Sequence, residues 1–368
     1  MLIDRYLLIE IIQTFLAVLL ILLLIFMGRY FTVFLADAVA GEIRGGMVID
    51  LLLLRTLSAL SMMLPFALYI SVLLAFGRLY KDNEMTALAS SGVTISRILK
   101  SVLAISLGFA IVVTAISLWI SPWAEYQRTL ITAEAEKTSA LEGVLPGQFN
   151  QIGSNKNGVF YVEDISEDRK NLTNVFAQIQ IDGKFDVFSA KGGYQYRDKN
   201  TGDQYLVLVD GFRYQGVPGN QNFTIQNYKK NAIRLVEPNI TSHSRRNSTV
   251  PTEQLFSDEN KKAQAELQWR LSMPIATILL AILGALISRT SPRQGRFAKL
   301  FVAIMIYIIY NNVMSIARSG IEQGKLPADI GMWWVHGVLF SFVLYMFYKQ
   351  SVGQQSYFKL IFGFNKSN

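Results

Sequence analysis

The 368-residue chain has no cysteine and only two histidines, His243 and His336. It therefore forms no disulfide and no thiolate metal site, and two histidines without a carboxylate at ligand spacing argue against any metal centre. No G-x-x-x-x-G-K-[ST] phosphate loop and no G-x-S-x-G nucleophile motif occurs. We therefore expect no enzyme activity and no cofactor within this chain, so that any ATP would be bound by a partner.

Charged residues are scarce, at 17% against about 25% in soluble domains, while 51% of the chain is hydrophobic. Six stretches without a charged residue approach the roughly 20 residues that cross a bilayer. They are 11–28, 56–77, 101–124, 271–288, 300–317 and 330–348. Three precede a long polar region and three follow it, which predicts an α-helical integral membrane protein with six transmembrane helices arranged 3+3.

The net charge of +8 comes from the loops and chain ends that flank these spans. Residues 121–268 contribute none of it, because they hold 17 Lys and Arg against 18 Asp and Glu. Basic residues such as Arg78, Lys100 and Arg293 gather in the loops that are inside when the N-terminus is cytoplasmic. This bias predicts cytoplasmic termini and places residues 125–268 on the other side. The positive excess is then a topology signal and a surface for anionic headgroups.

The stretch "RLYKDNEMTALASSGVTISRILK", residues 78–100, has the outline of a helix-turn-helix. Two facts argue against DNA binding. The stretch joins two spans on the cytoplasmic side, and Leu88 stands four residues before Gly92, where close helix packing needs a small residue.

We predict instead a short cytoplasmic helix over residues 82–91. Asp82 or Asn83 can cap it, and Glu84 lies in the first turn, where the helix dipole favours a carboxylate. Gly92 can end the helix, while Met85 and Leu88 form an apolar stripe. So short a helix needs a surface to dock on, and we interpret it as a coupling element for a soluble motor.

Residues 125–268 show period-two alternation of apolar and polar residues, with Gly, Asn and Asp between the runs. The runs are "GVFYVEDI" (158–165), "NVFAQIQID" (174–182), "KFDVFSAKGGYQYRD" (184–198), "QYLVLVDGFRYQG" (204–216) and "NFTIQNYKKNAIRL" (222–235). They predict an inserted all-β domain, an antiparallel sandwich or jelly roll, flanked by helices at 125–142 and 257–270. Its inward side chains form either a closed core or a groove open to lipid chains, and the sequence allows both.

Arginines lie near the outer ends of three spans, namely Arg29, Arg55 and Arg318. They either snorkel to headgroups or face a shared cavity and bind the phosphates of a large anionic lipid. Asp50 could instead neutralise Arg55, since it lies five residues away.

Four motifs carry a family resemblance: "GRLYKDNEM" (77–85), "GQFNQ" (147–151), "AELQWR" (265–270) and "SPRQGR" (291–296). With these motifs, and with a β domain between two sets of three spans, the chain resembles the lipopolysaccharide-export permease family, LptF/LptG. The similarity runs from Met1 to about residue 350. "GQFNQ" and "SPRQGR" favour the LptF branch.

The resemblance implies a subunit of an ABC transporter in the Gram-negative inner membrane. Its partners would be an LptG-like paralogous permease, two copies of an LptB-like ATPase and an LptC-like single-span protein. The complex would extract lipopolysaccharide and pass it through periplasmic jelly rolls toward the outer membrane.

Individual family positions map onto this sequence. The carboxylate that the family has in its coupling helix falls on Glu84. Two basic positions of the family fall on Arg318 and on Arg213. Of these two, we expect Arg213 at the entrance of the jelly roll. Two further basic positions of the family near the first span are replaced by Tyr30 and Val33, which leaves Arg29 alone there.

We therefore predict four segments: 1–124 with spans one to three, 125–268 as the periplasmic β domain, 269–350 with spans four to six, and 351–368 as a cytoplasmic tail. Two other functions stay open. One is a membrane-anchored β-sandwich scaffold without a transport role, and the other is a permease for another lipid, such as a phospholipid.

Overall fold

A computed structural model gives the fold of the chain. It describes residues 2–39, 43–142, 146–152, 158–166, 171–181, 184–197, 204–217, 224–235, 247–289 and 296–362. The chain divides into two compact units. One, here called the helical unit, comprises residues 1–29, 53–127 and 245–368; the other, here called the sheet unit, comprises residues 30–52 and 128–244.

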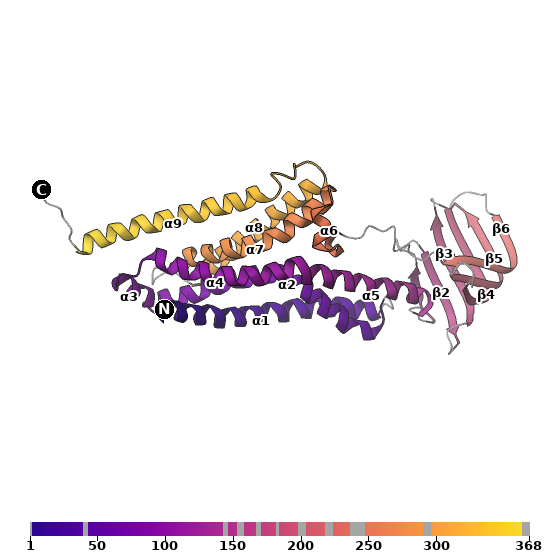
Figure 1. The fold of residues 1–368 in the computed structure, drawn as a ribbon. Coiled ribbons are helices and arrows are strands. Elements are labelled where there is room, and N and C mark those ends of the chain that lie inside the picture. The colour runs from indigo at the N-terminus through magenta and orange to yellow at the C-terminus, as the bar shows by residue number, and fades with distance from the viewer. Residues whose placement is uncertain are drawn as a thin grey trace. The chain divides into compact units, whose positions relative to one another are not determined.

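Each predicted span coincides with helix over all or nearly all of its length (Figure 1). The long helices are α1 (Leu2–Val39), α2 (Val48–Lys81), α4 (Ile95–Ala115), α5 (Ser121–Glu142), α7 (Lys261–Ile287), α8 (Arg296–Glu322) and α9 (Trp333–Phe362). Short elements are η1 (Gly45–Met47), α3 (Glu84–Ser90), η2 (Ile116–Ile120), η3 (Asn247–Thr249) and α6 (Thr252–Phe256). The third span runs through α4, the π-helical turn η2 and the start of α5.

Five described helical segments are long and apolar enough to cross a membrane: Ile3–Val39, Gly45–Lys81, Ile95–Ala133, Lys261–Ile287 and Lys299–Glu322. Helix α9 covers the sixth predicted span from Trp333 onward, but it is not among the five. Helix α9 also continues to Phe362. The segment 351–368, predicted as a cytoplasmic tail, is thus helical as far as Phe362, and its place on the cytoplasmic side stays a prediction.

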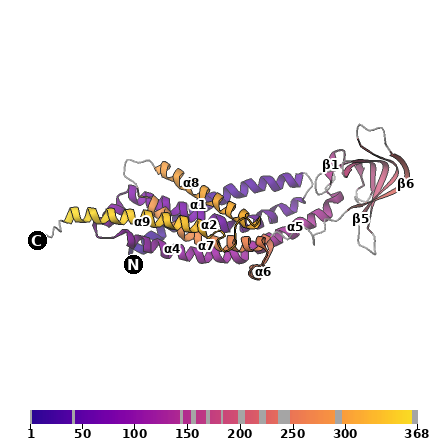
Figure 2. The same ribbon diagram turned by 90° about the horizontal axis from the view of Figure 1, so that it is seen from above.

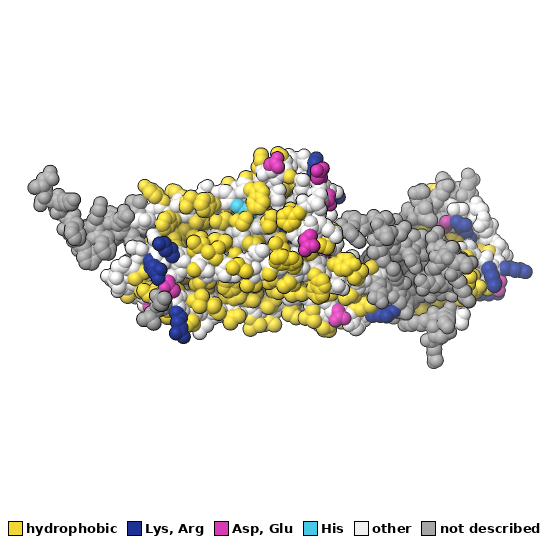
Figure 3. All heavy atoms as spheres, viewed as in Figure 1, with side chains coloured by type: hydrophobic (Ala, Val, Ile, Leu, Met, Phe, Trp, Pro, Cys, Tyr) yellow, Lys and Arg dark blue, Asp and Glu magenta, His cyan; other side chains and the backbone are white. Residues whose placement is uncertain are grey.

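Helices α2 and α7 form the centre of the helical unit. In the most apolar 18-residue stretch of each helix, 61% of the residues of α2 and 67% of those of α7 are buried, against 17% for α1 and 22% for α8. One core cluster joins α1, α2, α4 and α7, and a second joins α2, α7, α8 and α9. The views from two directions show α9 along one side of the helical unit (Figures 1 and 2), and apolar side chains cover much of the unit's surface (Figure 3).

The sheet unit confirms the inserted β domain but has a simpler topology than expected. Its described strands are β1 (Phe149–Ile152), β2 (Gly158–Ile165), β3 (Asn171–Ile181), β4 (Lys184–Arg197), β5 (Gln204–Gly216) and β6 (Thr224–Leu235). All neighbours pair antiparallel in sequence order, as one six-stranded sheet. A sandwich or a jelly roll packs two sheets, whereas the short links here let each strand pair with the next.

One face of this sheet, here called the inner face, carries the apolar core of the unit. Its buried side chains are Phe160, Val162, Leu172, Val175, Ala177, Phe188, Ala190, Leu206 and Leu208. They recur at alternate positions along the strands because successive side chains point to opposite faces. The curvature of the sheet is visible in Figure 2.

Candidate functional site

The short helix predicted over residues 82–91 is present as α3, Glu84–Ser90, with Glu84 in its first turn; its coupling role stays a prediction. Asn83 precedes the helix with φ of 60°, and its side chain makes no capping hydrogen bond. The prediction that the Asn83 side chain caps this helix was therefore wrong. Asparagine tolerates this left-handed conformation better than most residues. Gly92, with φ of 86°, follows the helix as predicted, and Val93 donates its N–H back to the carbonyl of Leu88 at 3.0 Å.

The apolar stripe of α3 faces the protein itself. Met85 is 4% exposed and belongs to the core cluster of α1, α2, α4 and α7, and Leu88 packs against the same cluster. Met85 thus anchors α3 to the membrane helices of the chain itself. The part that we predict for Met85 and Leu88 in ATPase coupling stays a prediction. Leu88 also lines a shallow groove with Ile3, Tyr6, Glu84, Ala87 and Ser91.

Glu84 is bound to α1, because the hydroxyl of Tyr6 donates to its Oε2 at 2.6 Å. The same end of α1 makes two further polar contacts. Arg78 of α2 pairs with Glu10, and Arg97 of α4 pairs with Asp4 at 2.7 Å. The first turns of α1 thus tie together α2, α3 and α4, so a displacement of α3 would reach all three neighbours.

A second polar cluster lies where α7 and α8 meet, here called the Glu266 cluster and made of Glu266, Arg270, Arg318 and Glu322. Glu266 accepts from Arg270 Nε at 2.9 Å and from Arg318 Nη2 at 2.7 Å. The Glu266 and Arg270 side chains are only 6% and 3% exposed. Arg318 also pairs with Glu322 at 2.9 Å and lies over the Trp269 ring.

Arg270 connects this cluster to the segment that enters α7. Its Nη1 donates to the Thr252 hydroxyl at 2.7 Å, and its Nη2 donates to the backbone carbonyls of Asn247 and Ser248 at 3.1 and 3.2 Å. The buried guanidinium thus has acceptors on η3, α6 and α7. Charged side chains are rarely buried unless they are paired in this way.

The three arginines predicted to bind lipid phosphates lie on three different helices. Arg55 on α2 pairs with Glu125 of α5 at 3.0 Å, a partner that the sequence analysis did not name. Arg318 on α8 has Glu266 and Glu322. Arg29 lies on α1 with an exposed side chain.

Arg213 lies on β5 with its side chain on the inner face, opposite Phe188 of β4. It pairs with Asp186 at 2.8 Å, and its guanidinium carbon lies 5.4 Å from the Phe188 ring centre. Within the part of the chain that the structure describes, Asp186 Oδ1 and Arg213 Nε are buried without a hydrogen-bond partner. Arg213 therefore introduces a polar site into an apolar face. That Arg213 lies at the entrance of the β domain for lipid stays a prediction.

Among the described residues of the helical unit, three buried carboxylates were not predicted as site residues: Glu10, Glu125 and Glu266. Each lies within five residues of one of the uncharged stretches that define the spans, so the lack of charge within a span gives no sign of it. For Glu266 a signal existed, because Glu266 and Arg270 have the i, i+4 spacing that favours ion pairs on a helix.

Comparison with known proteins points to one family. The family described as lipopolysaccharide export system permease LptF/LptG matches residues 5–349. The lipopolysaccharide export system permease protein LptF of Escherichia coli K12 is 28% identical over 341 residues, covering 91% of this chain and 92% of that protein. The LptF proteins of Escherichia coli O157:H7 and Shigella flexneri give the same values. The chain therefore belongs to the lipopolysaccharide export permease family LptF/LptG.

Proposed function

We propose that this chain is the transmembrane permease subunit of an ATP-driven ABC transporter. The transporter would extract lipopolysaccharide from the inner membrane and pass it to a periplasmic β-structured bridge toward the outer membrane. Membership of the LptF/LptG family supports the permease role. The observation that supports the ATP-driven mechanism is the seating of α3, which is anchored through Met85 and bound to α1 through Glu84.

The proposed partners are an LptG-like paralogous permease, two LptB-like ATPase subunits and an LptC-like single-span protein. Helices α1 and α8 have the least buried apolar windows of the five candidate spans. Large apolar surfaces of this kind face either lipid or another protein. We assign α1 and α8 to the boundary with the partner permease and the transported lipid.

In the proposed mechanism, closure of the ATPase pushes on α3. Since Met85 is embedded among α1, α2 and α4, α3 cannot move without displacing these helices. Their displacement narrows the cavity between this chain and its partner and drives the lipid outward. In this step Glu84 would lose its hydrogen bond from Tyr6 and form ion pairs with basic residues of the ATPase instead.

The lipid path in this proposal uses the predicted arginines. Arg29, Arg55 and Arg318 would contact lipid phosphates, and for the last two a phosphate must displace Glu125 or the carboxylates of the Glu266 cluster. Acyl chains would then pass along the inner face of the sheet, beside Arg213.

A charge reversal at Glu84 tests the coupling role. Glu84→Lys replaces a charge-assisted contact worth about 1.5–3 kcal/mol by a repulsion. ATPase co-purification and ATP-dependent release of lipopolysaccharide from proteoliposomes should therefore fall about tenfold to a hundredfold. The matched control is Asp82→Lys, the same charge change two residues before α3, where the side chain is exposed. If Glu84→Lys retains both activities, or if the two variants lose them equally, α3 does not couple through Glu84.

A further inference from the structure

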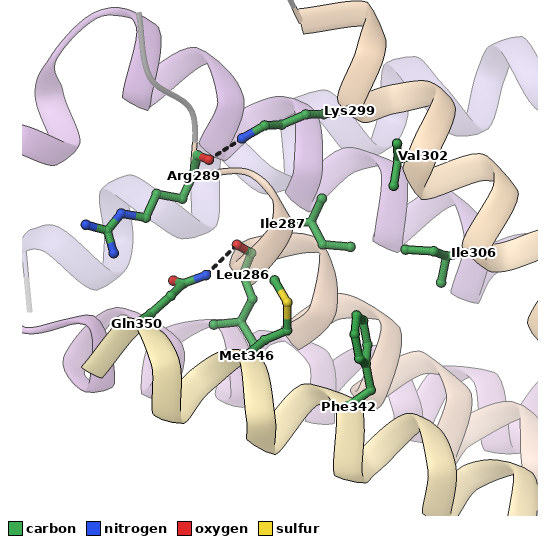
Figure 4. Close-up of a pocket in the computed structure, with 9 residues that line it drawn as sticks. All are labelled: Leu286, Ile287, Arg289, Lys299, Val302, Ile306, Phe342, Met346 and Gln350. Carbon is green, nitrogen blue, oxygen red and sulfur yellow. Dashed lines mark hydrogen bonds between the residues drawn. The ribbon is translucent and has the colours of Figure 1, made fainter. Parts of the chain in front are cut away.

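A groove lies at the end of the helical unit where α7 ends, α8 begins and α9 passes by (Figure 4). Its volume is about 370 Å³. Most of its lining is apolar: Leu286, Ile287, Val302, Ile306, Phe342 and Met346. The groove is thus an apolar slot between three helices of a membrane protein.

Three polar side chains, Arg289, Lys299 and Gln350, also line the groove. Lys299 Nζ donates to the backbone carbonyl of Arg289, and Gln350 Nε2 donates to the carbonyl of Leu286 at 2.8 Å. Within the described part of the chain no carboxylate is found paired with either cation. Gln350 Oε1 is buried and accepts no hydrogen bond there.

Two positive charges beside an apolar slot match an amphiphile with an anionic head and a hydrocarbon chain. A soluble anion would gain nothing from the apolar wall, and an uncharged lipid would gain nothing from the cations. Basic pockets between membrane helices on the cytoplasmic side are typical binding places for anionic headgroups. Arg289 also interacts electrostatically with Tyr80 at the end of α2, so the groove lies at the end of the unit that carries α3.

We infer that this groove binds one anionic phospholipid of the leaflet on the α3 side. Its phosphate lies between Arg289 and Lys299, and an acyl chain runs along Val302, Ile306 and Phe342. A headgroup hydroxyl donates to Gln350 Oε1. This lipid is a resident of the permease rather than its cargo, and its binding joins the ends of α7, α8 and α9.

Native mass spectrometry of the full-length chain in detergent tests this inference. Dioleoyl phosphatidylglycerol and dioleoyl phosphatidylcholine are titrated in separate samples. The phosphatidylglycerol adduct should form at about tenfold lower lipid concentration. Arg289→Gln/Lys299→Gln should remove this preference. The matched control Lys81→Gln/Lys100→Gln removes two exposed basic side chains near the same end and should retain it. Val302→Trp should weaken the adduct by filling the slot while both cations remain.

Three outcomes would overturn the inference: equal binding of the two lipids, a preference that survives in the groove variant, or displacement of the lipid by millimolar glycerol phosphate. The last outcome would mean a site for a soluble anion. Thermal unfolding of each variant without added lipid shows whether it is folded. Lipid binding here is independent of Glu84, so failure of this inference leaves the outcome of the Glu84→Lys test unaffected.

Discussion

Replacing Glu266 by glutamine should lower the free energy of unfolding of the helical unit by about 3–5 kcal/mol. Glu266 is the carboxylate shared by Arg270 and Arg318. The neutral amide keeps the size of the side chain but leaves the buried Arg270 guanidinium, 3% exposed, without a counter-charge. Removing one partner of a buried pair is costly because the remaining charge stays out of water. Apparent melting of the detergent-solubilised chain, followed by tryptophan fluorescence, measures the effect.

The same cluster provides the control. Glu322→Gln also removes a carboxylate from Arg318, but the Glu322 side chain is 34% exposed. Exposed pairs of this kind contribute about 0–1 kcal/mol. The double variant Glu266→Gln/Arg270→Gln should recover part of the loss, because it removes the uncompensated charge. Equal melting temperatures for Glu266→Gln and Glu322→Gln would show that burial does not determine the role of Glu266.

Replacing Gly284 by leucine should destabilise the helical unit by about 3 kcal/mol or more, through overpacking. Gly284 lies on α7 where it crosses α2, and a Cβ atom there would lie 2.8 Å from the backbone oxygen of Tyr69. Small residues at such crossings let two membrane helices approach closely. Because α2 and α7 are the most buried of the candidate spans, their separation would disturb both core clusters. The yield of monodisperse protein in detergent and the melting temperature should both fall.

Gly108→Leu on α4 is the matched control for Gly284→Leu. Apart from the nearby backbone of α4 and the two chain neighbours, no described atom lies within 4 Å of a Cβ at Gly108, and the residue is exposed. Leucine forms helix better than glycine by up to about 1 kcal/mol, so this variant should be as stable as the natural chain or slightly more so. If both leucine variants lose stability to the same degree, the close approach of α2 and α7 is not the cause.

The sequence predicted the membrane helices well because a bilayer imposes a length and an apolar composition that show directly in the residues. The helix ends were less predictable. Residues 351–362 continue α9, since a segment of mixed polarity can extend a helix once the preceding turns are formed. The strands were recognisable by alternation, but alternation does not reveal whether strands form one sheet or two, and here they form one.

The sequence does not show which residues far apart along the chain form ion pairs with each other. Arg55 and Glu125 are separated by 70 positions, and Glu266 and Arg318 by 52, so only the packing of the helices shows that they meet. The stripe of Met85 and Leu88 predicted an amphipathic α3. It did not indicate that the apolar side would be buried against the chain's own α1, α2 and α4, rather than offered to a partner.

The central claim is that lipid passes along the inner face of the sheet during ATP hydrolysis. A photoreactive benzoyl-phenylalanine can be placed at Phe188, which is 5% exposed on that face, or at Ser189, which is exposed on the opposite face. In proteoliposomes of the complete transporter, we predict lipopolysaccharide adducts at position 188 that require ATP, and few at position 189. Adducts to protein alone would favour a scaffold. Adducts to phospholipid instead would favour another substrate, and equal lipopolysaccharide labelling at both positions, or labelling without ATP, would contradict the claim.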